Sequence, residues 1–222
     1  LIAGLTEGNL ASPNAGSADA FVSKFSPEGQ QLWTKQFGTV QRDESYGVTT
    51  DAQGGIYIAG FTDGNLAGQI GGRDAFLAKY DSAGSPVWKR QFGSMGFDEI
   101  TDVAADEAGV YVSGATRGQF TQPSAGQRDL FAAGFTLAGD LRWRSQLGTS
   151  ANDFLGGVAV DNVGGIFLAG YTQGALASPV GGLGDAVLLK VAIPEPQSIA
   201  VASWASFALL SIRRAVRSAQ RQ

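Results

Sequence analysis

The sequence predicts an all-β protein, a partial and open β-propeller of about three and a half four-stranded blades, followed by a C-terminal apolar helix. Two observations predict the blades. Landmark residues recur every 55 positions, and each 55-residue unit contains short apolar runs separated by glycine-rich turns. A period near 50 with several strands per unit is typical of propeller blades. The recurring positions are Trp33, Trp88 and Trp143; Asp51, Asp106 and Asp161; Asp43, Asp98 and Asp153; and Asp19, Asp74 and Asp129.

Each complete unit divides into four predicted strands. In the second unit they are YGVTTD ending at Asp51, IYIAGFT from Ile56, DAFLAKY from Asp74 and PVWKRQFG from Pro86. The chain opens at Leu1 with LIAGLT, which corresponds to the second strand of a unit, so we expect fourteen strands and a closed ring that is incomplete in this chain. The repeats extend over residues 1–192, and a segment of different composition follows over 193–222.

Short turns and longer loops alternate along each unit. Asp-x-x-Gly separates the first strand from the second, and a short segment ending in Gly29, Gly84 or Gly139 separates the third from the fourth. Both are hairpin signals, with glycine taking a positive φ. The other two connections are longer. Because successive strands reverse direction, we expect tight turns at one end of the array and loops at the other.

Composition excludes several kinds of chemistry. The 222 residues include no cysteine and no histidine, which removes thiolate chemistry, the usual general base near neutral pH and the commonest zinc ligand. The formal net charge of −4 makes the chain a poor partner for phosphate backbones, so no nucleic-acid binding is expected. One tryptophan per unit is interpreted as a packing residue between blades.

The repeat resembles the β-propeller repeat family SBBP. The resemblance runs from Leu1 to about Val191 and is carried by DAFVSKF, LWTKQFG, GVTTDAQGGIYIAG, DAFLAKY, VWKRQFG, VAADEAGVYVSG, LRWRSQLG and GVAVDNVGGIFLAG. It implies that the strands ending at Asp51, Asp106 and Asp161 are innermost. Gly134 replaces the lysine found at Lys24, Lys79 and Lys190, which argues against a shared catalytic lysine.

The tail resembles a PEP-CTERM sorting signal, which implies export, transient anchoring in the membrane and cleavage by an exosortase-type membrane protease. The residues that carry it are Pro194, Glu195 and Pro196, the apolar residues 198–212, and Arg213, Arg214 and Arg217. The apolar segment is 15 residues long. As a helix it would measure roughly 22 Å, short of the ~30 Å hydrocarbon core of a bilayer. An amphipathic helix docked on the propeller is the alternative, because Trp204, Phe207 and Leu210 recur at helical spacing.

The looped end carries acidic residues once per unit. We interpret Asp43, Asp98 and Asp153, with their neighbours Glu44, Glu99 and Asn152, as a solvated acidic rim and a candidate binding surface. Calcium is the cation that clustered carboxylates would bind, but no calcium-loop pattern is present and no metal site or cofactor is assigned. Arg117, Arg128, Arg142 and Arg144 make the third unit more basic. Arg142 and Arg144, on either side of Trp143, are interpreted as residues that discourage pairing at an outer strand edge, with a polyanion-binding patch as the alternative.

Two functions follow as hypotheses. The first is an exported, non-catalytic propeller of the cell envelope or extracellular matrix that binds polysaccharide or protein through its loops, with no catalytic residues. The second is a secreted carbohydrate-active enzyme, a hydrolase or lyase, that uses loop carboxylates.

Overall fold

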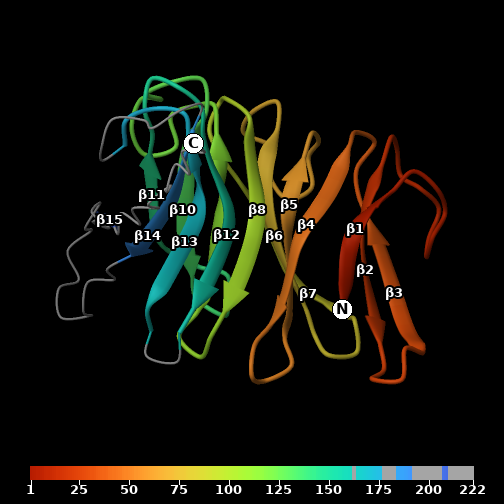
Figure 1. Cartoon of the computed structure of the whole chain (residues 1–222). Helices are drawn as coiled ribbons and strands as arrows, with labels where there is room; N and C mark the ends of the chain where they lie inside the picture. Colours follow the sequence, from red (N-terminus) through yellow and green to blue (C-terminus); the bar gives the residue numbers. More distant parts are fainter. Residues whose placement is uncertain (162–163, 177–183, 192–206, 210–222) are drawn as a thin grey trace, which may run out of the picture.

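The computed structural model describes residues 1–161, 164–176, 184–191 and 207–209. All fourteen predicted strands are present, a short fifteenth follows, and antiparallel pairing joins them into four sheets (Figure 1). Sheet 1 consists of β1 (Ile2–Thr6), β2 (Asp19–Phe25) and β3 (Gln31–Phe37). Sheet 2 consists of β4 (Asp43–Thr50), β5 (Ile56–Thr62), β6 (Asp74–Tyr80) and β7 (Pro86–Phe92). Sheet 3 consists of β8 (Asp98–Ala105), β9 (Val110–Thr116), β10 (Asp129–Phe135) and β11 (Leu141–Leu147). Sheet 4 consists of β12 (Asp153–Val160), β13 (Ile166–Thr172), β14 (Asp185–Val191) and β15 (Phe207–Leu209).

The sheets stand face to face as the blades of an open propeller. The first strand of each complete unit lies at one edge of its sheet, and these strands, β4, β8 and β12, stand side by side (Figure 1). They end next to Asp51, Asp106 and Asp161, so the inner position expected from the family resemblance is confirmed. The fourth strands β7 and β11 form the opposite edge, which places Arg142 and Arg144 on an outer strand as expected.

Alternate side chains of a middle strand pack on opposite neighbours. Ile56 and Ile58 of β5 face the cluster shared with sheet 1, whereas Tyr57 and Ala59 face the cluster shared with sheet 3. A strand with both faces buried reads as a nearly continuous apolar run, which is why IYIAG and DAFLAKY do not alternate with polar residues. Each sheet therefore depends on its neighbours for its core.

The repeated tryptophans connect consecutive sheets, which confirms their interpretation as packing residues. Trp88 of β7 packs against the core between sheets 2 and 3, and its indole N–H donates to the carbonyl oxygen of Leu137 over 3.3 Å. Lys79 Nζ donates to the same oxygen over 3.2 Å. Gly139 in that hairpin has a φ of 86°, and a Cβ there would lie 2.9 Å from Cδ2 of Trp88. Glycine thus serves both the turn and the contact.

In the described part of the chain, the turn end contains the hairpins at residues 26–30, 51–55, 81–85, 106–109 and 136–140 together with the turn between β12 and β13, and all of these except 106–109 contain a glycine with positive φ. Gly109 is the exception, since it does not have the positive φ that the Asp-x-x-Gly pattern predicts. This hairpin is one residue shorter, so Gly109 takes the place of Gly55, and the carbonyl group of Phe135 leaves no room for a side chain.

The looped end, at the top of Figure 1, is made of the connections at 7–18, 38–42, 63–73, 93–97, 117–128 and 148–152 together with the described parts of 173–184. The expected helix over 198–212 lies outside the described residues except for Phe207–Leu209, which pair with β14 as β15 in the outer position of sheet 4. In the part of the chain that the structure describes, no helix is long and apolar enough to cross a membrane.

Candidate functional site

The repeated aspartates of the looped end are buried. Asp43, Asp98 and Asp153 each begin an inner strand, and each residue is 0% exposed. The interpretation of these residues as a solvated acidic rim is therefore wrong, because their carboxylates are turned inward and bonded to the loop that precedes them. Asp98 Oδ2 accepts from the backbone N–H of Ser94 over 2.6 Å and from its hydroxyl over 2.9 Å. Thr39 and Thr149 donate in the same way to Asp43 and Asp153.

A second set of buried aspartates, Asp19, Asp74 and Asp129, begins the third strand of each unit and is bonded to a repeated glutamine. Gln91 Nε2 donates to Asp74 over 2.8 Å and to the carbonyl of Gly64 over 2.8 Å. Gln91 Oε1 accepts from the backbone of Leu66 and Ala67. Gln36 and Gln146 make the corresponding bonds in sheets 1 and 3. These glutamines were not singled out from the sequence, although their spacing of 55 was visible in WTKQFG, WKRQFG and WRSQLG.

Burial raises the pKa of Asp43 and of Asp98, two of the aspartates that begin the inner strands. Desolvation is the main cause at Asp43 and at Asp98, and the nearby carboxylates of Asp19 and Asp74 act in the same direction. Among the described residues, Oδ1 of Asp43 and Oδ1 of Asp98 have no hydrogen-bond partner, which leaves the charged forms incompletely stabilised. The carboxylates thus hold the loops in shape.

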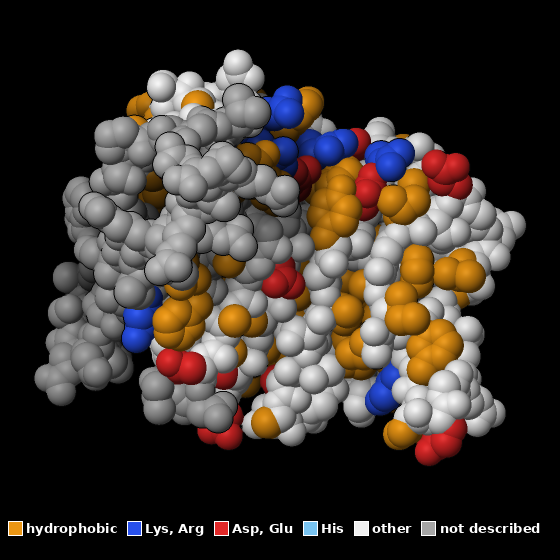
Figure 2. Space-filling view, in the orientation of Figure 1, with side chains coloured by type: hydrophobic (Ala, Val, Ile, Leu, Met, Phe, Trp, Pro, Cys, Tyr) orange, Lys and Arg blue, Asp and Glu red, His pale blue; other side chains and the backbone are white. Residues whose placement is uncertain are grey.

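Arginine occupies the surface above this buried layer, and Figure 2 shows Lys and Arg side chains along the looped end at the top of the view. Backbone hydrogen bonds fix where the arginines stand. The N–H of Asp98 donates to the carbonyl of Arg73 over 3.0 Å, and the N–H of Arg117 donates to the carbonyl of Phe97 over 2.8 Å. The segments before β6, before β8 and after β9 therefore lie side by side.

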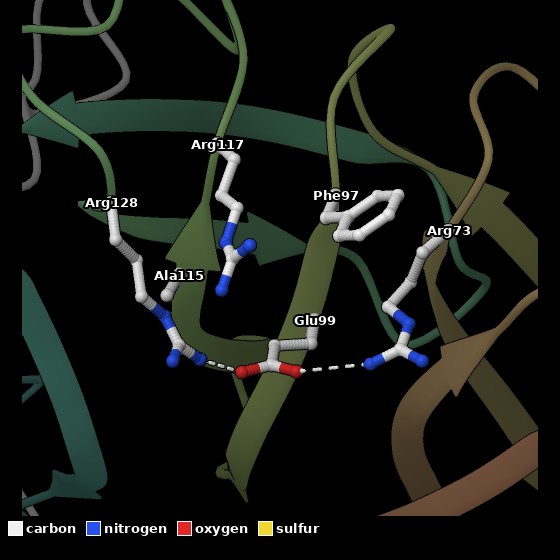
Figure 3. A pocket seen from close by; sticks show the side chains of 6 residues that line it. All are labelled: Arg73, Phe97, Glu99, Ala115, Arg117 and Arg128. Atoms are coloured by element: carbon white, nitrogen blue, oxygen red, sulfur yellow. Dashed lines mark ion pairs between the residues drawn. The ribbon is translucent and has the colours of Figure 1, made fainter.

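Side chains on and near these segments form a small pocket of about 50 Å³ (Figure 3). It is lined by Arg73, Phe97, Glu99, Ala115, Arg117 and Arg128. Glu99 of β8 lies between two of the arginines. It forms an ion pair with Arg128, and its other carboxylate oxygen is 3.8 Å from Arg73 Nη1. Within the described part of the chain, no ion pair involves Arg117. Burial lowers the pKa of Arg128, mainly through desolvation, and its guanidinium is 4.8 Å from the ring centroid of Phe154.

A second, shallower groove of about 650 Å³ adjoins the pocket, because Arg117 lines both. Its other lining residues come from two loops and an outer strand: Met95, Gly96, Gly118, Gln119, Phe120, Thr121 and Arg144. Arg144 lies over the ring of Phe120 at 5.2 Å. The groove thus combines apolar, amide and hydroxyl groups with two cations.

The structure brings together only part of what the sequence suggested. Arg117 and Arg128 meet at the pocket, but Arg142 and Arg144 do not line it, and the third arginine is Arg73 of the preceding unit. No group of three acidic side chains among the described residues could hold a metal ion. The tail residues Pro194, Glu195, Pro196, Arg213, Arg214 and Arg217 lie outside the described residues, so their sorting role stays a prediction.

Comparisons with known proteins agree with the fold. A model of the SBBP family, described as a β-propeller repeat, matches residues 32–67 and 142–176. Both segments run from a tryptophan-bearing fourth strand through the following inner strand into the second strand. The chain is also similar to the regulatory protein FlaEY of Caulobacter vibrioides (strain ATCC 19089 / CIP 103742 / CB 15), with 27% identity over 117 residues that cover 49% of this chain and 12% of that protein. The four stacked sheets and the two matched segments together identify this chain as one that contains β-propeller repeats.

Proposed function

We propose that this chain is a non-catalytic binding module of the cell envelope or extracellular matrix, and that its looped end recognises a polysaccharide or a protein. One observation carries the proposal. The aspartates that recur at the looped end are buried and bonded to loop backbone, so they act as structural supports. What they support is a surface of arginine, aromatic and amide groups around two hollows. Such a surface suits binding better than acid–base chemistry.

Export and sorting belong to the same proposal. The triplet Pro194, Glu195 and Pro196, the apolar segment 198–212 and the arginines Arg213, Arg214 and Arg217 would direct an exported chain to an exosortase-type protease. The apolar segment would anchor the chain only until cleavage, which would leave the propeller outside the cell.

A panel of neutral and acidic polysaccharides tests the binding function with the full chain. We expect at least one polymer to be retained on the immobilised protein without release of new reducing ends or unsaturated sugars. Glu44→Gln and Glu99→Gln are the informative variants for the enzyme alternative, because these carboxylates are paired with arginine near the surface, whereas the aspartates support the fold. If the wild-type chain cleaves a polymer and either variant loses this activity, the enzyme hypothesis would replace the binding proposal.

A further inference from the structure

We propose that Arg73, Arg117 and Arg128 form a subsite for one carboxylate group of an acidic polysaccharide, with the adjoining groove taking the neighbouring sugar. The inference deepens the proposed function and rests on it. It assigns a chemical class to the ligand and a role to residues that only part of the repeat array shares, since Arg73 and Arg128 occupy the same position in the second and third units. Ala18 and Gly184 occupy positions equivalent to Arg73 and Arg128 in the first and last units.

The charges of the pocket do not balance. Three guanidinium groups line it together with a single carboxylate, that of Glu99. Asp63 binds Arg73 at the side, with distances of 2.7 Å to Nε and 3.1 Å to Nη2. No acidic side chain among the described residues forms an ion pair with Arg117. One positive charge therefore remains, which an anionic group of charge −1 would neutralise.

The side chain of Arg73 and the backbone of Arg117 are held in place before any ligand arrives. Asp63 fixes the guanidinium of Arg73, which also lies 3.6 Å from the ring centroid of Phe61. The backbone N–H of Arg117 donates to Phe97, and the backbone carbonyl of Arg73 accepts from Asp98. These hydrogen bonds hold the backbones of both arginines next to the segment that precedes β8. Side chains that are already ordered lose little conformational entropy on binding.

The size of the pocket limits the group that enters. About 50 Å³ accommodates a few non-hydrogen atoms, as in a carboxylate, but not a sugar ring. The ring has room in the groove of about 650 Å³, which Arg117 also lines. Met95, which is 83% exposed, lines this groove, where Gln119 and Thr121 offer hydrogen-bonding groups for hydroxyls. Phe97, which is 51% exposed, lines the small pocket.

A polysaccharide fits these features better than a nucleic acid. Nucleic acids are bound by extended basic surfaces, because each phosphate of the backbone carries a charge and the release of counterions drives binding. Here the formal net charge is −4, and the arginines of this surface are limited to one small pocket and the adjoining groove of mixed polarity. An isolated charge followed by hydroxyl-rich rings matches an acidic sugar polymer.

The test uses the full chain with polygalacturonate and with its fully methyl-esterified form, in which a methyl group on each carboxyl removes its charge. Arg117→Gln removes the arginine that has no ion pair among the described residues. Arg42→Gln is the control, because it removes the same charge from an arginine that lies outside the pocket lining and is paired with Glu44. We expect binding of polygalacturonate to weaken about tenfold in Arg117→Gln, as for loss of one charge-assisted hydrogen bond, and to change less than about twofold in Arg42→Gln. The ester is expected to bind weakly to every form.

Glu99→Gln gives a result that a purely structural role would not. Glu99 competes with the ligand for Arg128, so its neutralisation should tighten binding of polygalacturonate by about threefold, even if the variant unfolds at a lower temperature. Equal or weaker binding in Glu99→Gln would count against the subsite. Equal affinity of the wild-type chain for the ester would do the same, and so would full displacement of the polymer by single-stranded DNA at physiological salt.

Titration with the monosaccharide galacturonate separates the subsite from the wider function. Shifts of the arginine Nε–H resonances that are absent in Arg117→Gln would support the subsite directly. Polymer binding that does not depend on Arg117 would leave the binding function in place and remove the subsite. Arginine shifts with the monosaccharide, without binding of any polysaccharide, would overturn the proposed function instead.

Discussion

Asp74 and Asp98, which begin strands in two different sheets, come together on either side of Gly93. A Cβ built on Gly93 would lie 2.6 Å from Asp98 Oδ2 and 3.1 Å from Asp74 Oδ1. Gly38 stands in the same relation to Asp19 and Asp43 in the preceding unit. The glycines that follow β3 and β7 therefore make room for two carboxylates that come from adjacent sheets.

Gly93→Ala should destabilise the protein, because the added methyl group meets two buried carboxylates that are bonded to loop backbone. We expect a loss of about 1–3 kcal/mol in the free energy of unfolding, typical of overpacking. Gly8→Ala is the matched control, since a Cβ there meets only Thr6 Oγ1 at 3.9 Å. Urea unfolding of both variants measures the difference. An unchanged midpoint for Gly93→Ala would mean that the carboxylate pair is looser than the structure indicates.

The repeated glutamine should matter as much as a core residue. Gln91→Leu removes four hydrogen bonds and leaves the Asp74 carboxylate and three backbone groups of the loop at 64–67 without this partner. We expect a loss of about 3 kcal/mol, because unsatisfied buried polar groups cost about 1–3 kcal/mol each and part of the loop can turn to water. Gln69→Leu, in the exposed part of the same connection, should cost less than about 0.5 kcal/mol. Similar unfolding midpoints for the two variants would contradict this role.

Stability should depend on the protonation of Asp98. Its folded-state pKa is raised above 3.8 by desolvation, so the folded protein takes up this proton more readily than the unfolded chain does. The resulting stabilisation is fully present below about pH 3.8 and is lost as the pH rises through the folded-state pKa. Asp98→Asn cannot titrate at this position.

The wild-type protein should therefore gain stability relative to Asp98→Asn as the pH falls from 7 towards 4. Paired urea unfolding series at several pH values measure this difference. Asp81→Asn is a control, because the pKa of that fully exposed carboxyl is lowered, mainly by a hydrogen bond from the backbone of Ser85, and the sign of the effect is then reversed. A gap between wild type and Asp98→Asn that stays constant or moves the other way would show that Asp98 is charged and well solvated.

The sequence was sufficient for the strands and insufficient for the site. Apolar runs and glycine turns repeated at 55 positions predict β1 to β14 because both signals are local. The sequence pattern of an aspartate at a strand end is the same whether its side chain faces solvent or bonds to the preceding loop. The sequence therefore predicts a surface position for Asp43, Asp98 and Asp153, which are buried. Arg73 and Arg117 belong to different units, and only the hydrogen bonds at the junction around Phe97 bring them together. Contacts between units are invisible to a comparison of one unit with the next.

The tail should be removed when the protein is exported. Pro194 and Pro196 disfavour helix around the triplet and keep the chain accessible to a protease, while the 15-residue apolar segment is too short to hold the chain firmly in a bilayer. Arg213 and Arg214 favour the cytoplasmic side for the end that they occupy. Mature protein should accordingly be found outside the cell and end near Pro196.

Alanine at Pro194, Glu195 and Pro196 together should yield an uncut form that stays with the membrane. Ser218→Ala combined with Gln220→Ala changes the tail outside the triplet and should leave processing unchanged. Intact mass measurement on protein from the medium and from the membrane fraction distinguishes the forms, because cleavage near Pro196 removes the tail with its four arginines. Extracellular protein that still ends at Gln222 would exclude the sorting signal and favour the alternative, in which the tail is a helix docked on the propeller.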